Sequence, residues 1–556
     1  MTNKILKPAL GVAALALVTA GCVDEFEPQS ATVTIEQVST APGAYSNFVT
    51  ALTSTFAGQF LYDASSKYPF DFGYSAFFLA RDVTGQDISP RGDWFSYWYE
   101  SSAVLGPTYA ICQLPWTLYY GWIKNCNTVI SVAKTDLTED KYNGLGQAYA
   151  VRAMLYYDLA QMFCSKAYGI DKESLTVPIV TDETSSSDLA NNPNATNEEI
   201  YAFILSDLDE AEKYISQDKV DAYTIGINFV YGLKARTYLF MEDWANAEKY
   251  AKLAQEGYSV MSQDEYTSWE TGFNTPNSAW IYALQFKSDD PCILLNDADS
   301  SWGSQMCIEI DPEASACGYA ANYGQPNTID QHLYSTIPST DCRKKCYVDF
   351  AINDLSGDEQ LEALSAYSNH PKWLVNCAKA SDDGTVGGLE LKFRTAGGEA
   401  GRANQYIGFL VSVPVMRVEE MKLIEAEAAA WQDEARGKAL LEAFAKTRDD
   451  NFVYGLHAGE AYGNNATPGV INEIWWQRRV ELWGEGFALG DIKRLNKGII
   501  RSYAGTNHKD GFQWNTDGPA DWMNFCIVQT ETNYNKACVS NPAPVAPEEN
   551  SAPHVF

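Results

Sequence analysis

Histidines and the motifs of enzyme active sites are scarce in this sequence. Its five histidines stand singly and no Cys-x-x-Cys occurs, so local spacing assembles no zinc or redox site. It has no Gly-x-Ser-x-Gly elbow, no Ser, His and Asp arrangement, and no glycine-rich phosphate loop before a helix. A glycoside hydrolase would need a carboxylate pair, and no pair stands out among 72 acidic residues. We therefore predict a protein that is not an enzyme and holds no transition metal.

Basic residues are also few. The chain has 40 of them against 72 acidic residues, which gives a formal net charge of −32. Such a surplus of negative charge repels phosphate backbones and argues against nucleic acid as a partner.

The apolar run at 9–20 is too short to span a bilayer. It follows Lys4 and Lys7 and precedes Gly21-Cys22, which is the layout of a secretory signal with a small-residue cleavage site. The cysteine predicts a lipoprotein signal at 1–21, lipidation of Cys22, and an acylated N-terminus and tether at 22–40. Thr19 stands where leucine is usual, so a plain soluble secretory signal is the alternative.

Cysteines do not suggest a complete disulfide framework. The chain has twelve, and setting Cys22 aside leaves eleven, so at least one stays unpaired in an oxidising compartment. Cys342 and Cys346 could pair across one turn.

Helical periodicity is strong outside these regions. The segments 116–133 and 144–163 carry apolar residues at helical spacing and are expected to be buried helices. Thr196 and Glu199 form a capping box at the start of another apolar stripe, which predicts a helix beginning there.

Two later segments predict helix hairpins. Residues 229–257 contain two helical runs joined near 242–243, and 418–449 repeats the pattern, with small residues at spacings that resemble a tetratricopeptide hairpin. Between them, 258–414 is rich in turn residues and lacks sustained periodicity, which in a compact protein usually indicates function. The predicted fold is mainly α, a single domain at 41–540 with hairpins as scaffold and long irregular loop insertions. The Pro- and Glu-rich tail at 541–556 is expected to be flexible.

The segment 471–495 reads as a helix that buries charges beside tryptophans. Arg478, Glu481 and Glu485 are three and four residues apart, so we expect ion pairs along one face. One sequence motif here resembles the C-terminal signature of the SusD/RagB family. It reads Arg-Arg-Val-Glu-Leu-Trp-Gly-Glu-Gly followed by Gly-Asp-Ile-Lys-Arg, and Phe487, Ala488 and Gly490 depart from the family pattern. These residues are expected to hold helices together and to touch no ligand.

Four further segments resemble sequence motifs of the family and occur in the same order, at 71–87, 340–350, 413–428 and 525–535. In the last of these, Val528 stands where the family prefers proline. The resemblance covers nearly the whole mature chain.

The resemblance implies a lipid-anchored outer-membrane protein that faces the cell exterior and captures oligosaccharides. It also implies a partner, a TonB-dependent β-barrel transporter of the SusC type, that receives the ligand. The alternatives are a peptide-binding lipoprotein of the RagB kind and a helical-repeat scaffold without a small ligand.

Aromatic residues are plentiful, with 15 Trp, 33 Tyr and 24 Phe. Sugar rings stack their C–H faces on aromatic planes, while neighbouring polar side chains form hydrogen bonds with the sugar hydroxyls. By resemblance, the loop region after the first helices supplies the ligand surface, which makes these residues the first candidates: Arg81, Trp94, Tyr97 and Trp98. Their alternative role is as core residues.

Trp302, Tyr319 and Tyr323 form a second candidate set because they lie in the irregular stretch, where aromatics are less easily explained as core. Four acids of that stretch leave calcium open as an alternative: Asp289, Asp290, Asp297 and Asp299. Their spacing lacks the glycine and terminal glutamate of an EF-hand, so we predict no cofactor.

Overall fold

Helices with broad apolar faces dominate the computed structural model, and the predicted mainly α fold is confirmed. The structure describes residues 43–58, 61–62, 68–92, 94–101, 105–313, 318–381, 384–460, 462–463, 466–541 and 543–556. Residues 45–556 form one compact unit. The predicted signal, Cys22 and the tether lie outside the described residues.

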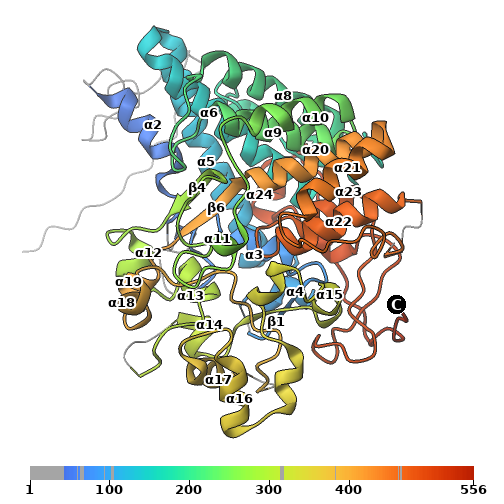
Figure 1. Ribbon diagram of the computed structural model, residues 1–556. Coiled ribbons are helices and arrows are strands. Elements are labelled where there is room, and N and C mark those ends of the chain that lie inside the picture. Colours follow the sequence, from blue (N-terminus) through green and yellow to red (C-terminus); the bar gives the residue numbers. More distant parts are fainter. Residues whose placement is uncertain are drawn as a thin grey trace, which may run out of the picture. The chain divides into compact units, whose positions relative to one another are not determined.

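The long helices lie side by side in Figure 1, and each contacts its neighbour in chain order. They are α5 (Ala110–Thr135), α6 (Glu139–Phe163), α8 (Asn197–Tyr214), α9 (Ile227–Phe240), α10 (Trp244–Ala254), α20 (Val418–Gln432), α21 (Glu434–Ala445) and α22 (Gly469–Glu481). Helix α10 also contacts α20, so the two predicted hairpins pack together although 163 residues of sequence separate Ala254 from Val418.

The start of α8 follows the predicted capping box. The Thr196 hydroxyl accepts a hydrogen bond from the Glu199 backbone N–H at 3.2 Å, and the Glu199 carboxylate accepts one from the Thr196 N–H at 2.8 Å. Both bonds satisfy N–H groups that the first helical turn leaves unpaired, and this fixes where the helix begins.

The first hairpin turns where the sequence predicts. Glu242 adopts a left-handed φ of 60°, and the Asp243 side chain caps α10 by accepting from the Asn246 N–H at 3.2 Å. Ala235, Ala247 and Ala251 are fully buried, because small side chains allow helices to approach closely.

Short elements fill the remainder. The strands form two-stranded antiparallel pairs, β1 (Ile88–Pro90) with β5 (Asn327–Ile329), β2 (Leu175–Pro178) with β3 (Asn194–Thr196), and β4 (Trp280–Gln285) with β6 (Ser412–Arg417). The short helices are α2 (Ala44–Ser54), α3 (Ala76–Asp82), α4 (Ser96–Tyr99), α7 (Ser186–Leu189), α11 (Gln263–Tyr266), α12 (Pro291–Leu294), η2 (Asn296–Ala298), α13 (Trp302–Met306), α14 (Gly318–Asn322), α15 (Gln331–Thr336), η3 (Cys342–Cys346), η4 (Phe350–Asp354), α16 (Gly357–Leu364), α17 (Pro371–Ala380), α18 (Gly398–Arg402), α19 (Gln405–Gly408), α23 (Ala488–Arg494), η5 (Asp521–Met523) and α24 (Gln529–Tyr534).

The segment 471–495 is two helices, not the one helix expected from its sequence. Helix α22 ends at Glu481, and α23 begins at Ala488. Between them Gly484 and Gly486 have φ values of 77° and 86°, which glycine adopts without steric cost. The chain therefore turns sharply inside the family signature.

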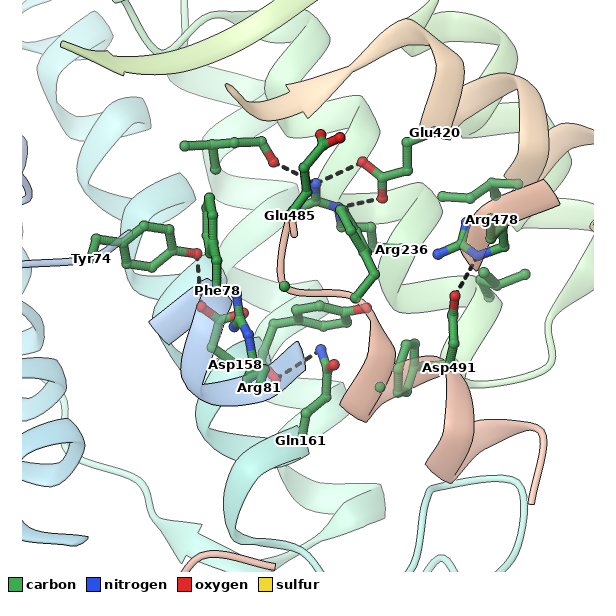
Figure 2. Close-up of a pocket in the computed structure, with 18 residues that line it drawn as sticks. Tyr74, Phe78, Arg81, Asp158, Gln161, Arg236, Glu420, Arg478, Glu485 and Asp491 are labelled. Carbon is green, nitrogen blue, oxygen red and sulfur yellow. Dashed lines mark hydrogen bonds and ion pairs between the residues drawn. The ribbon is translucent and has the colours of Figure 1, made fainter. Parts of the chain in front are cut away.

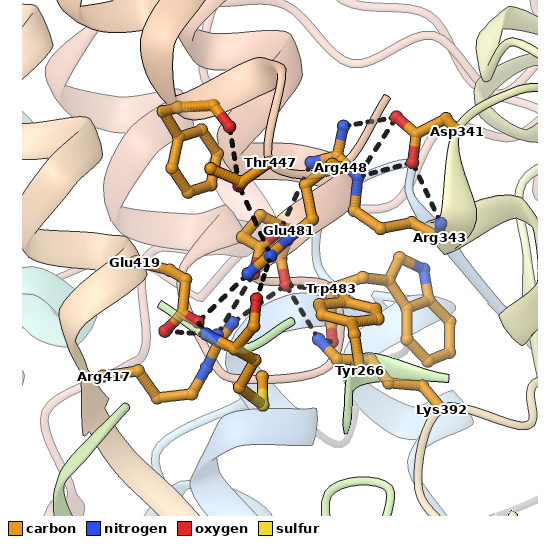
Figure 3. Close-up of polar contacts among 12 residues, drawn as sticks. Tyr266, Asp341, Arg343, Lys392, Arg417, Glu419, Thr447, Arg448, Glu481 and Trp483 are labelled. Carbon is orange, nitrogen blue, oxygen red and sulfur yellow. Dashed lines mark hydrogen bonds and ion pairs between the residues drawn. The ribbon is translucent and has the colours of Figure 1, made fainter. Parts of the chain in front are cut away.

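Glu481 and Glu485 pair with distant residues, and Arg478 pairs with Asp491 of α23 at 2.6 Å. The expected ion pairs among Arg478, Glu481 and Glu485 along one helix face are therefore not formed. Buried Glu481 accepts from Arg448 Nε at 3.0 Å, Arg417 Nη1 at 3.1 Å and Arg343 Nη1 at 3.3 Å (Figure 3). Glu485 pairs with Lys392 at 2.7 Å. These bonds join segments separated by up to 138 residues, in keeping with the expected structural role.

The cysteines of the described ranges are buried free thiols. Cys342 and Cys346 are among them, at the two ends of η3. The disulfide that their spacing suggested is therefore not formed.

The C-terminal tail packs against the body of the unit, where the sequence suggests flexibility. The His554 N–H donates to Ser502 O at 2.8 Å, and the Phe556 ring stacks on His332 with centroids 3.3 Å apart. Tyr503 contributes a further ring contact with Phe556 at 5.4 Å.

Candidate functional site

Pairing of β1 with β5 brings two predicted site segments together. Ile88 lies opposite Ile329 and Pro90 opposite Asn327, and the Arg91 N–H continues the ladder to Pro326 O at 3.2 Å. In an antiparallel pair, the residues after one strand lie beside the residues before the other. Segments 91–99 and 318–326 therefore meet at one end of this pair.

The backbone approach at this end is close. A Cβ at Gly92 would lie 2.2 Å from the Gln325 Cβ, so a larger residue would push the two segments apart. Buried Arg91 donates to Thr385 Oγ1 at 2.9 Å and to Gly387 O at 3.0 Å. A third segment thus fixes the loop that carries Trp94.

Half-exposed rings gather where these segments meet. Trp94 and Tyr319 are in edge contact with centroids 5.9 Å apart, and Tyr319 lies 5.2 Å from Tyr323. Beneath them, buried Phe70 contacts Trp94 at 6.4 Å, Tyr97 at 6.5 Å and Tyr68 at 5.5 Å. We call the set Tyr68, Trp94, Tyr97, Tyr319 and Tyr323 the aromatic surface.

The aromatic surface keeps its rings partly accessible while it fixes their positions. Tyr323 is 49% exposed, and the other four are half-buried. Rings held by neighbouring rings lose little conformational freedom when a ligand stacks on them. Such a surface can bind flat apolar faces, including the C–H faces of sugars.

Trp98 and Trp302 lie in the core. Trp98 is 1% exposed and stacks on Phe95 with centroids 5.7 Å apart. Trp302 is fully buried, with its ring edge-on to Phe393 at 5.1 Å. In this structure neither presents a ring face to solvent, and Trp98 supports the aromatic surface from below through its contact with Phe70.

Arg81 is buried inside the helical core, away from solvent (Figure 2). Its guanidinium pairs with Asp158 at 2.8 Å, and the same carboxylate accepts from the hydroxyls of Tyr74 at 2.7 Å and Tyr119 at 2.8 Å. Arg81 and Asp158 line an internal cavity of about 30 Å³, which is room for one water molecule. This geometry suits a structural role.

Two of the acids considered for calcium lie in a turn, Asp297 within η2 and Asp299 at its C-terminal end. Within the described ranges, no group of three or more His, Cys, Asp and Glu side chains is arranged to hold a metal ion. Asp297 accepts from the Tyr406 hydroxyl at 3.0 Å. Tyr68 and Tyr406 are not among the candidates that the sequence singles out, although the density of aromatic residues around 62–74 signals Tyr68.

Two family models match the chain. One, described as starch-binding and associating with the outer membrane, matches residues 78–239, and the SusD family model matches residues 379–545. The mainly helical fold and the burial of the signature charges agree with these matches. The chain belongs to the SusD/RagB family.

Relatives and solved structures extend this finding. A SusD-like protein of Formosa agariphila is 27% identical over 160 residues, which cover 28% of this chain and only 29% of that relative. A SusD-like carbohydrate-binding protein of Bacteroides vulgatus superposes with a TM-score of 0.67 at 22% identity, covering 89% of this chain and 97% of that one.

Two further solved structures have the same fold. A SusD superfamily protein of Bacteroides fragilis superposes with a TM-score of 0.62 at 20% identity, covering 90% of this chain and 99% of that one. A laminarin-binding SusD-like protein gives 0.60 at 18% identity, covering 90% and 98%. In the part of this chain that the structure describes, none of the helices has the length and apolar character needed to cross a membrane.

Proposed function

We propose that this protein binds oligosaccharides on the aromatic surface, without a catalytic role, and delivers them to an outer-membrane transporter. The contact between Trp94 and Tyr319 at 5.9 Å carries the proposal. It joins two candidate segments that are 225 residues apart in the sequence, and it leaves their rings half-exposed. Family membership supports the ligand class, since one related structure is described as laminarin-binding.

Calorimetric titration of the soluble form that begins after Cys22 tests the proposed class of ligand. The panel comprises plant, host and microbial oligosaccharides, with mixed peptides for comparison. Binding to one glycan class is expected, and Trp94→Ala or Tyr319→Ala should each reduce affinity at least tenfold, because each removes a buried stacking contact worth about 1.4 kcal/mol or more.

Matched controls are available on the same chain. Trp431 is 37% exposed and stacks on Trp244 of the helical scaffold, and Tyr534 is 62% exposed. Trp431→Ala and Tyr534→Ala should leave glycan affinity unchanged. Binding of peptides without detectable binding of any sugar would instead support the peptide-uptake alternative.

We further propose that lipidated Cys22 anchors the protein to the outer membrane, facing the exterior, where it closes captured ligand over a SusC-like TonB-dependent β-barrel. The helical scaffold offers a large rigid face for such an interface.

After the native membrane is solubilised in detergent, a β-barrel protein should co-purify with this protein. Purification without any barrel would count against the partner, and release of Cys22→Ala into the soluble fraction tests the anchor.

A further inference from the structure

Trp269, in the loop that follows α11, is half-buried, and buried side chains hold it from the protein side. The Arg394 guanidinium lies over the indole, 5.7 Å from the ring centroid, and this arginine is only 3% exposed and pairs with Glu309 at 2.6 Å. The Trp269 carbonyl accepts a hydrogen bond from Arg402 Nη2 at 2.7 Å. A buried cation therefore lies against one face of the indole, and the accessible area of the ring is on the opposite face and the edge.

Buried Arg402 links this loop to a second half-buried tryptophan at the start of α17. Its Nη1 atom lies 3.2 Å from Glu270 Oε1 and 3.2 Å from Glu399 Oε1. Glu399 Oε2 in turn lies 2.9 Å from His370 Nε2, and the His370 ring stacks on Trp373 with centroids 3.7 Å apart. These contacts join the loop after α11, helix α18 and the start of α17 into one surface. We call the following set the second surface: Trp269, Glu270, His370 and Trp373.

Glu270 keeps one carboxylate oxygen available at the second surface. Its Oε1 atom pairs with Arg402, whereas Oε2 has no hydrogen-bond or ion-pair partner among the described residues. The side chain is 57% exposed. The space beside Oε2 is open because residue 398 is a glycine, since a Cβ there would lie 2.8 Å from this oxygen. The pair with Arg402 holds the carboxylate in place, so a ligand meets an oriented acceptor that costs little to order.

The second surface combines an aromatic face with an oriented hydrogen-bond acceptor, and this combination recognises sugars. A carboxylate accepts short, charge-assisted hydrogen bonds from hydroxyl groups. Arg394 and Arg402 are buried and already paired with carboxylates, so neither is free to bind an acidic sugar. Glu270 and Glu399 also repel negative charge. The ligand that fits this chemistry is therefore a neutral sugar unit.

We propose that the second surface binds a neutral sugar unit of the same polysaccharide that the aromatic surface binds, so that the protein contacts long glycans at two places. This inference rests on the proposed glycan-binding function and deepens it. When one polymer occupies two sites on the same protein, the second binding event becomes intramolecular, and the affinity for the polymer exceeds the affinity of either site. The second surface therefore favours long neutral chains over short ones.

Affinity electrophoresis in native gels tests the second surface with whole polysaccharides. The gels contain starch, laminarin, xylan or mannan as neutral polymers and polygalacturonate as the acidic comparison. One of the neutral polymers should retard the wild-type protein most. Trp269→Ala should lower the affinity for that polymer at least tenfold, because binding through one surface loses the advantage of two. In the Trp94→Ala background, Trp269→Ala should abolish the retardation that remains.

Glu270→Gln keeps the shape of the side chain, removes its charge and should lower the polymer affinity at least threefold. Trp431→Ala and Glu359→Gln, at a partly exposed and an exposed side chain of other helices, are the matched controls and should change nothing. Urea midpoints check that each variant is folded.

Retardation that Trp94→Ala lowers, but that both Trp269→Ala and Glu270→Gln leave unchanged, overturns the second surface and leaves the proposed function standing. Retardation by polygalacturonate alone, or by none of the polymers, also overturns the second surface. If the oligosaccharide panel shows no binding either, the proposed function is overturned as well.

Discussion

Buried carboxylates of this protein behave in opposite ways, depending on the charges beside them. Burial alone raises the pKa of Glu481, but the guanidiniums of Arg448, Arg417 and Arg343 outweigh it and hold that pKa below its usual range. Glu390 has only two backbone N–H groups and more distant cations, so burial prevails and raises its pKa to about 8. Glu481 therefore stabilises the fold at neutral pH, and ionised Glu390 opposes it.

Because burial raises the pKa of Glu390, we expect the contribution of this carboxyl to stability to fall as the pH rises. It ionises near pH 4.3 when unfolded and near 8 when folded. The unfolded state binds fewer protons between these values, so the contribution is complete below about pH 4.3 and is lost as the pH rises through about 8. Glu390→Gln should therefore gain stability relative to wild type from pH 5 to pH 9, measured by urea unfolding.

Glu359→Gln, on an exposed face of α16, is the control and should run parallel to wild type. Parallel curves for Glu390→Gln would contradict the prediction.

At the scale of elements, helix packing depends on small residues at contact points. Gly437, in the first half of α21, faces Ala430 of α20, and a Cβ there would lie 2.3 Å from the Ala430 Cα. The two helices of this hairpin therefore approach closely only because position 437 lacks a side chain. The small residues of this segment predict the hairpin from the sequence, but no sequence pattern marks the contact between Gly437 and Ala430.

Gly437→Ala should destabilise the protein by about 1–3 kcal/mol, because the added methyl overpacks the hairpin. The control is Gly121→Ala, in the middle of α5, where an added Cβ meets nothing within 4 Å. That change should stabilise by about 0.5–1 kcal/mol through the reduced entropy of the unfolded chain. Urea unfolding gives the free energy of unfolding of each variant relative to wild type. If both substitutions changed it by the same amount in the same direction, the packing explanation would be refuted.

At the scale of the molecule, the C-terminal residues join segments that are remote in sequence. Phe556 covers His332, and the His554 backbone pairs with Ser502. Deleting residues 551–556 should lower the free energy of unfolding by about 1–3 kcal/mol, since apolar ring contacts and backbone hydrogen bonds are lost together. Val555→Ala, at a side chain that is 88% exposed, should have no effect. An unchanged urea midpoint after the deletion would show that the tail contributes nothing.

The sequence also predicted parts of the candidate site. It singled out Trp94, Tyr97, Tyr319 and Tyr323, whose rings the structure brings together half-exposed or exposed. It grouped them with Trp98, Trp302 and Arg81, which are buried. Aromatic side chains serve cores and ligand surfaces equally well, so residue type alone does not separate the two roles.

What the sequence determined by itself is local. Apolar spacing and the capping box at Thr196 and Glu199 placed the helices, because these signals act between residues three or four positions apart. The tertiary structure alone decided which rings face solvent, which arginines meet Glu481, and that Trp94 lies beside Tyr319. The last of these depends on pairing between β1 and β5, which brings together residues as far apart as Ser89 and Thr328, 239 residues along the chain. The partners of Glu481 are up to 138 residues away, and no short-range pattern encodes contacts of such separation.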